Sequence, residues 1–289
     1  MGIMLPMRTV IRDELTFEVV EDGPPDGDPV LLLHGFPQRA SSWAGVAARL
    51  AARGYHCVAP DQRGYSPGAR PSGARAYAAD ELVADALAVL EATAGPDRRA
   101  HLVGHDWGGL VAWRLAARHP DRVRSLTAVS VPPPAALAAA LRRPGQALRM
   151  WYVLAFQVPG LVERLYHAHG RRFSPRFAAA LRGTGQSAAA AERDAAGLAD
   201  PAALTGALNW YRAIRFTPSE VDPSVRVPTL FVWSSDDSAV GRAAVLRVDR
   251  YVRAPFRFVE LCGVSHWIPD ETPGPLADLI EQHLAAHPG

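Results

Sequence analysis

The 289-residue chain contains no lysine, so all 31 of its basic residues are arginines. Against 29 acidic residues they leave a formal net charge of only +2. The arginines gather in short pairs, as at residues 142–143 and 171–172, which is typical of a solvated surface. Because the chain has no basic stripe of the kind that binds nucleic acid, we expect no nucleic-acid partner.

Cysteine and long apolar runs are also scarce. Cys57 and Cys262 are too few for the disulfide framework of a small secreted protein. No run approaches the about 20 apolar residues that a membrane span needs, and residues 1–12 contain no long apolar targeting segment. No cluster of Cys, His and carboxylates has zinc-ligand spacing. We therefore expect a cytoplasmic protein without membrane contact, metal or organic cofactor, and the oligomeric state stays open.

Short apolar segments alternate with helix-like segments over the first half of the chain. This rhythm is typical of a mostly parallel sheet covered by helices on both faces, an α/β fold. A strand pair at residues 9–12 and 15–20 precedes it. The expected strands are residues 30–33, 56–59, 100–103 and 123–129, and the expected helices are residues 41–53, 77–94 and 110–118.

The alternation stops at residues 131–134 (VPPP). From there to about residue 222 the chain is alanine-rich, with helix-like segments broken by Gly and Pro. Because a structureless loop of this length is uncommon, the segment predicts a helical cap inserted between two strands. The alternation then resumes with strands at 229–233 and 256–261 and helices at 243–251 and 275–286. We predict a core of residues 1–131 and 223–289 and a cap of residues 132–222.

The segment 104–109 (GHDWGG) follows a short apolar run and precedes a helix-like run. It has the frame of a nucleophile elbow, a strained strand-to-helix turn in which small residues leave room for close packing. Asp106 stands where Ser is usual. A carboxylate attacks an electrophilic carbon without first losing a proton, so this position favours opening a C–O or C–halogen bond over ordinary ester hydrolysis. His105 is expected to belong to the elbow backbone, with its side chain pointing away.

An elbow nucleophile needs an acid and a histidine later in the chain, in that order. Asp236 and Asp237 follow the expected strand 229–233, and His266 follows the expected strand 256–261. Both places lie at the carboxyl ends of strands, where open α/β sheets form their sites. These residues are therefore the candidate partners of Asp106, with either aspartate as the acid.

Three motifs together give the chain a family resemblance. Residues 34–37 (HGFP), residues 61–65 (DQRGY) and the elbow resemble those of soluble epoxide hydrolases with the α/β-hydrolase fold. The resemblance covers about residues 30–273. Two later segments carry it further, because residues 152–160 (YVLAFQVPG) and 209–212 (NWYR) are similar to the two family segments that hold epoxide-activating tyrosines.

The resemblance implies an α/β-hydrolase fold and a specific set of site residues. An epoxide is opened to a vicinal diol through an ester on Asp106, and water activated by His266 hydrolyses that ester. The position of Ser234 in the family's turn selects Asp237 as the acid, with Asp236 as the fallback. The implied epoxide-activating donors are Tyr152 and Tyr211; the oxyanion hole is the backbone of Phe36 and Trp107; and the substrate pocket is lined by Phe36, Pro37, Trp107, Phe156, Gln157 and Trp267.

Two other functions compete with this interpretation. A haloalkane dehalogenase shares the fold, the Asp nucleophile and the His–acid pair, but it holds halide with side-chain N–H donors. Trp107 supplies one such donor, whereas Phe36, at the usual position of the second, has none. A non-catalytic ligand-binding protein on the same scaffold would need a broken triad, and no member is visibly missing. The expected partners are therefore a small-molecule epoxide and water.

Overall fold

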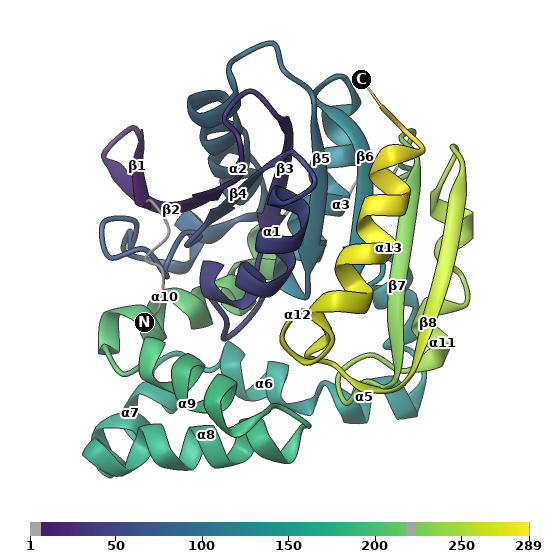
Figure 1. Ribbon diagram of the computed structural model, residues 1–289. Coiled ribbons are helices and arrows are strands. Elements are labelled where there is room, and N and C mark those ends of the chain that lie inside the picture. Colours follow the sequence, from purple (N-terminus) through teal and green to yellow (C-terminus); the bar gives the residue numbers. More distant parts are fainter. Residues whose placement is uncertain (1–6, 218–222, 289) are drawn as a thin grey trace.

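The computed structural model describes residues 7–217 and 223–288, and its centre is one sheet of eight strands (Figure 1). The strand order is β1-β2-β4-β3-β5-β6-β7-β8. β1–β2 and β2–β4 are antiparallel, and every other neighbouring pair is parallel. The strands are β1 (Met7–Arg12), β2 (Leu15–Asp22), β3 (Asp28–Leu33), β4 (Tyr55–Pro60), β5 (Ala100–His105), β6 (Val123–Val129), β7 (Thr229–Asp236) and β8 (Phe256–Ser265). The predicted mostly parallel sheet is confirmed.

Strand β3 shows why its short apolar run is a central strand. Successive side chains of a strand point to opposite faces of the sheet. Leu31 and Leu33 accordingly belong to the hydrophobic cluster on one face, and Val30 and Leu32 belong to the cluster on the other. All four are fully buried, as expected for a parallel strand with helices on both sides.

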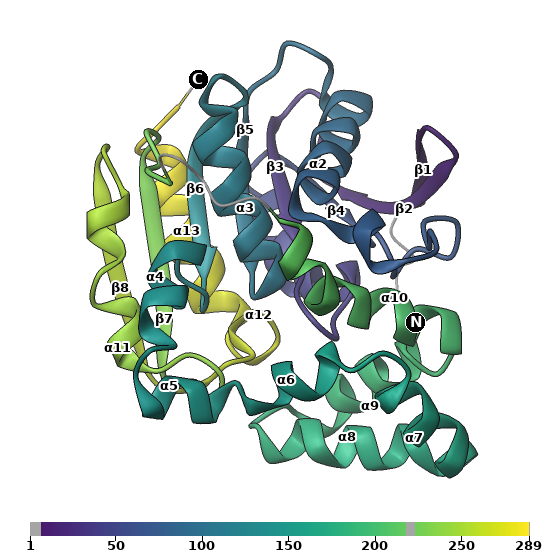
Figure 2. The same ribbon diagram turned by 180° about the vertical axis from the view of Figure 1, so that it is seen from behind.

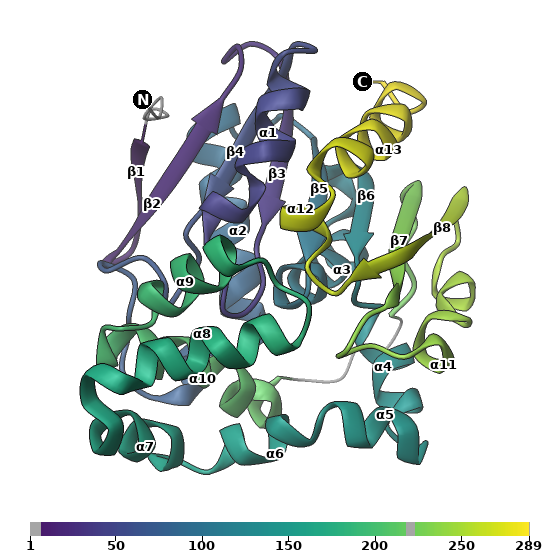
Figure 3. The same cartoon turned by 60° about the horizontal axis from the view of Figure 1, so that its bottom comes forward.

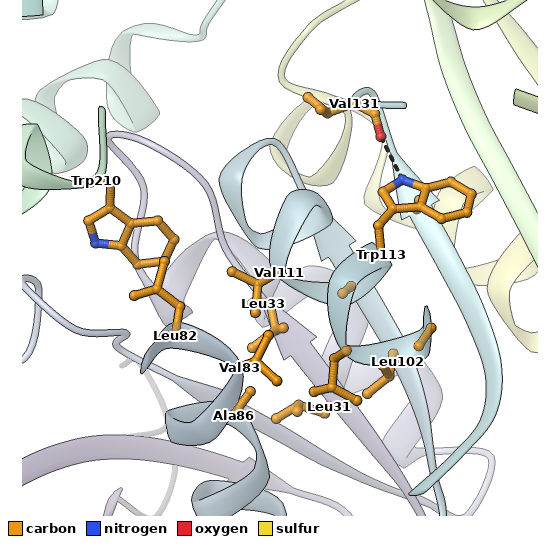
Figure 4. Packing of buried hydrophobic residues seen from close by; sticks show 14 of the residues in the cluster. Leu31, Leu33, Leu82, Val83, Ala86, Leu102, Val111, Trp113, Val131 and Trp210 are labelled. Atoms are coloured by element: carbon orange, nitrogen blue, oxygen red, sulfur yellow. Dashed lines mark hydrogen bonds between the residues drawn. The ribbon is translucent and has the colours of Figure 1, made fainter. Parts of the chain in front are cut away.

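Helices cover the two faces of the sheet. Figure 1 shows α1 (Ala44–Ala51) and α13 (Pro273–Ala285) in front of it, and Figure 2 shows α2 (Ala79–Ala94) and α3 (Trp107–Arg118) on the opposite face. Figure 4 shows Leu31 and Leu33 among side chains of α2 and α3, and the indole of Trp113 donates to the carbonyl of Val131 at 3.0 Å. The helices after β3, β4 and β5 thus pack as the alternation predicts.

Between β6 and β7 the described residues form a series of α-helices and no strand of the sheet, and we call these helices the cap helices. Most of them lie below the sheet in Figure 1, and Figure 3 brings this side of the molecule forward. The predicted division into core and cap stays a prediction, and its boundary at residue 222 lies outside the described residues. The cap helices are α4 (Pro134–Ala140), α5 (Pro144–Arg149), α6 (Trp151–Gln157), α7 (Leu161–His169), α8 (Phe173–Gly183), α9 (Ala188–Gly197) and α10 (Pro201–Arg212).

Short elements complete the fold. The expected helix 243–251 is broken into α11 (Arg242–Val245) and a 3-10 turn (Val248–Tyr251), and α12 (Ile268–Glu271) precedes α13. The other 3-10 turns are Ala40–Trp43, Ala74–Tyr77, Pro120–Arg122, Gly170–Arg172 and Ala213–Phe216. Within the ranges that the structure describes, no helix is both long and apolar enough to span a bilayer.

Candidate active site

Asp106 occupies the strained turn between β5 and α3. Its φ of 52° and ψ of −119° lie in a region that residues with a side chain rarely adopt. The turn is crowded: a Cβ on Gly108 would stand 2.1 Å from the carbonyl oxygen of Leu33, and one on Gly104 would stand 2.4 Å from that of Gly108. The glycines of the motif therefore let β3, β5 and α3 approach closely enough to present Asp106 at the end of the sheet.

The loop after β3 holds one oxygen of the Asp106 carboxylate. The backbone N–H of Phe36 donates to Asp106 Oδ1 at 2.8 Å. Gly35 makes this approach possible, because a Cβ there would lie 2.5 Å from the same oxygen. Trp107 is the first residue of α3, where helix amides have no partner within the helix. The predicted oxyanion donors thus flank Asp106, and the Phe36 amide already contacts it.

His266 and Asp237 come together beside Asp106. His266 Nδ1 lies 2.8 Å from Asp237 Oδ2, and His266 Nε2 lies 3.8 Å from Asp106 Oδ2. The other Asp237 oxygen accepts the backbone N–H groups of Ala239 and Val240 at 2.8 and 2.7 Å. The side chain of Asp237 is fully buried, whereas Asp236 is exposed. Of the two candidate acids, Asp237 is the one that contacts the histidine.

Electrostatics favour an ion pair in the resting site. Burial alone would lower the pKa of His266, but the carboxylates of Asp237 and Asp106 together raise it to about 10. Burial alone would raise the pKa of Asp106, but His266 holds it below its ordinary value. At neutral pH Asp106 is therefore ionised and His266 protonated. Neutralising Asp106 would remove one of the two charges that keep the proton on His266.

The two candidate tyrosines come from different cap helices and lie close to each other. Tyr211 of α10 is buried, and its ring centroid lies 5.3 Å from that of Phe36 and 5.0 Å from that of Trp107. Tyr152 of α6 is half-buried, 6.3 Å from Tyr211 between ring centroids. Burial raises the pKa of both phenols, with the charge of Asp106 adding to the effect. Both tyrosines therefore keep the proton that a hydrogen-bond donor needs.

Two further predicted lining residues, Phe156 and Gln157, contact Tyr211 in different ways. The Phe156 ring packs 4.9 Å from Tyr211 and 5.6 Å from Phe36, so an aromatic cluster surrounds Tyr211. The amide of Gln157 instead donates to the backbone carbonyl of Tyr211 at 2.6 Å.

Trp267 lies beside His266, and Pro37 directly follows Phe36 in the chain. The indole of Trp267 donates to Thr184 at 3.0 Å while its ring lies 5.3 Å from that of His266. Pro37 is buried behind a cis peptide bond with Phe36. For all the predicted lining residues, the role of contacting substrate stays a prediction.

The side chain of His105 makes contacts that the sequence does not predict. The sequence predicts that His105 belongs to the elbow backbone with its side chain pointing away, yet its buried ring lies 4.9 Å from that of His266. Its Nε2 bonds the His266 carbonyl at 2.9 Å, and its Nδ1 lies 2.9 Å from the side-chain oxygen of Gln38. The amide of Gln38 donates to Asp270, which pairs with Arg193 of α9. The expectation for His105 is therefore corrected: its side chain helps to hold the backbone of His266.

That network had weak sequence signals. His105 directly precedes Asp106 at the end of β5, and Gln38 directly follows the HGFP motif in the loop after the neighbouring strand β3. Their pairing depends on the tertiary path of α12 and α9. In the described part of the chain no group of three or more His, Cys, Asp or Glu side chains is arranged to hold a metal ion.

The family follows from comparison with known proteins. The sequence model described as "alpha/beta hydrolase fold" matches residues 28–273. Epoxide hydrolase A of Mycobacterium tuberculosis is 34% identical, with 96% of each chain covered. The chain belongs to the α/β-hydrolase-fold epoxide hydrolase family.

Solved structures of other members of this family agree with the fold. Epoxide hydrolase I of potato, Solanum tuberosum, superposes with a TM-score of 0.83 at 26% identity, covering 97% of this chain and 99% of its own. Epoxide hydrolase A of Mycobacterium thermoresistibile gives a TM-score of 0.81 at 28% identity over 98% of both chains.

Proposed function

We propose that this enzyme, a hydrolase acting on ether bonds, opens an epoxide to a vicinal diol through a covalent ester on Asp106. The observation that carries the proposal is the arrangement of three groups. An ionised Asp106 faces His266, and the phenol of the buried Tyr211 lies against the two residues that flank Asp106. A nucleophile, an acid–base group and an oxygen-directed donor therefore surround one place.

In the first half-reaction Asp106 Oδ2 attacks one ring carbon of the epoxide. The C–O bond breaks, and its electron pair stays on the epoxide oxygen. Tyr211 and Tyr152 donate hydrogen bonds to that oxygen, and one phenol gives it a proton. Because Oδ1 is held by the Phe36 amide, Oδ2 is the oxygen left to attack. The product of this step is an ester between Asp106 and the opened substrate.

In the second half-reaction water cleaves the ester. Esterification removes the negative charge of Asp106, which lowers the pKa of His266 from its resting value of about 10. The resting proton of His266 then passes to the phenolate left by the first half-reaction, which frees the imidazole to act as a base. His266 takes a proton from water while the hydroxide oxygen bonds to the Asp106 carbonyl carbon. The Phe36 and Trp107 amides stabilise the oxyanion. Collapse breaks the bond to the product oxygen, which leaves with the proton from His266. The proton that remains on the Asp106 carboxyl passes to His266 and restores the resting ion pair.

Halide release is less well supported by the same site. The Trp107 ring lies 5.0 Å from that of Tyr211, and Phe36 adds no side-chain donor. Two phenols that keep their protons match a developing alkoxide. A cytoplasmic location and the absence of nucleic-acid and membrane partners remain predictions.

The test is a turnover assay with purified protein. We expect styrene oxide and other small apolar epoxides to give diols, and 1-chlorobutane to give no halide above the Asp106→Ala background. Halide release without diol formation would replace the epoxide proposal with the dehalogenase alternative. The absence of both products, with ligand still bound, would favour a binding protein.

A further inference from the structure

Gln146 is a buried polar residue on an exposed helix. It is 3% exposed and is the buried residue of α5. Its side-chain amide is satisfied at both ends by the backbone of the loop after β7. Gln146 Nε2 donates to the carbonyl of Ala239 at 2.8 Å, and the N–H of Gly241 donates to Gln146 Oε1 at 2.8 Å. Backbone groups of the loop thus hold this cap residue through two hydrogen bonds.

The loop that Gln146 holds is the loop that fixes Asp237. The N–H of Val240, which donates to Asp237 Oδ1, belongs to the same peptide unit as the Ala239 carbonyl. A donor on the oxygen of a peptide unit both orients the unit and strengthens the hydrogen bond made by its N–H. Gln146 therefore acts on Asp237 through one rigid peptide plane.

Two more side chains complete the support of this loop. Arg149, one helical turn after Gln146, donates from Nη1 to the Asp237 carbonyl at 2.7 Å. The indole of the buried Trp233 donates to the Val240 carbonyl at 3.0 Å. Gly241 leaves little spare room, because a Cβ there would stand 3.4 Å from Gln146 Oε1 and 3.3 Å from Arg149 Nε. Two of the three supports therefore come from α5 in the cap.

We propose that Gln146 is a positioning residue for the triad acid, so that α5 serves the water-attack step. This inference rests on the proposed ester mechanism. The first half-reaction uses Asp106 and the two phenols and requires no general base. The second needs His266 to gain a proton, and the carboxylate of Asp237 stabilises that charge. Loosening the Asp237 loop therefore slows ester hydrolysis and leaves ester formation nearly unchanged.

The test compares the two half-reactions in Gln146→Met, which keeps the side-chain length but removes both hydrogen bonds. Rapid-quench single turnovers with styrene oxide give the rate of ester formation by intact mass and the rate of diol release. We expect diol release to fall about 10- to 100-fold, as for a displaced catalytic group, with ester formation within about twofold. The ester then accumulates on the variant.

A pH profile separates positioning from mere loosening of the cap. Because Asp237 raises the pKa of His266, a displaced carboxylate raises it less. The midpoint of the hydrolysis rate should therefore move to lower pH in Gln146→Met. Arg149→Met, whose side chain is exposed, should shift the same quantities in the same direction by a smaller factor. If Gln146→Met does not fold, Arg149→Met still tests the proposal.

The matched control is Gln186→Met, another buried glutamine of the cap, whose amide donates to Asp194 rather than to the Asp237 loop. It should lower the melting temperature without changing the ratio of the two rates. Equal losses in both half-reactions of Gln146→Met, or a lower melting temperature with unchanged rates, would reduce Gln146 to a structural contact. A wild-type protein that forms diol without any ester would instead remove the proposed mechanism itself.

Discussion

The core and the cap helices place their functional side chains in different ways. The core presents Asp106, Asp237 and His266 immediately after strand ends, within two residues of β5, β7 and β8. The cap presents Tyr152, Tyr211 and Gln146 from the faces of three helices. The core thus fixes the proposed nucleophile and its proposed acid–base pair by backbone geometry, whereas the cap helices supply the proposed donors, whose positions depend on how the helices dock.

This difference predicts that substitutions in the core and in the cap helices have different effects on the reaction rate. Loss of a core group should slow one chemical step by the larger factors, while loss of a cap group should slow its step by smaller factors. The largest expected effect is at the nucleophile. Asp106→Ala should lower turnover of styrene oxide by about 10⁴-fold or more, because no other described carboxylate contacts His266 Nε2. Diol formation measured by chromatography gives the result, and near-normal turnover would move the nucleophile elsewhere.

Removal of the core base should separate the two half-reactions. In His266→Gln we expect ester formation to continue and diol release to fall about 10²- to 10⁴-fold, the range for a lost acid–base catalyst. Intact mass after mixing should show one substrate added per chain. A variant that turns over slowly without any added mass would show that His266 also serves the first step.

The cap tyrosines should give intermediate effects of unequal size. Tyr211→Phe should lower the rate of ester formation about 10²- to 10³-fold, as for loss of one oxyanion-type donor. Tyr152→Phe should cost less, because Tyr152 is half-buried and Tyr211 is buried. Circular dichroism checks that both variants fold. Normal rates in the two single variants and in the double variant would remove the cap from the first step.

The core elements could be predicted well from the sequence, because the sequence signals for them are local. The buried run of β3, the elbow around Asp106 and the strand-end position of His266 each depend on neighbouring residues, so order along the chain was enough to find them. The contacts of His105, Gln38 and Gln146 were not found. Each joins residues at least 67 positions apart, and no periodicity encodes such a pairing.

The cap was predicted only in outline for the same reason. Its helical character follows from composition and from the Pro and Gly breaks. The direction of each side chain depends on docking, so the hydrogen bond from Gln157 to the Tyr211 carbonyl could not be predicted. The expected helix 243–251 is likewise divided in two, although its apolar residues suit a continuous one.

The smallest predicted effect concerns stability rather than turnover. The pKa of His266 is raised from 6.5 to about 10 in the folded protein, so the folded state holds this proton more tightly than the unfolded chain. The resulting stabilisation is complete below pH about 6.5 and is lost as pH rises through about 10. The melting temperature should therefore decrease as the pH is raised from about 6.5 to about 10, and the decrease should be smaller in His266→Gln. An equal fall in both proteins would assign it to other groups.

The central claim is that a core carboxylate becomes an ester during turnover. One turnover of styrene oxide in heavy-oxygen water, followed by digestion and mass measurement of the peptide that contains Asp106, tests it directly. The account predicts diol formation and one heavy oxygen in the Asp106 carboxylate, because water attacks the ester carbonyl. Diol formed with an unlabelled Asp106 and a labelled product would mean direct attack of water on the epoxide, and it would contradict the account.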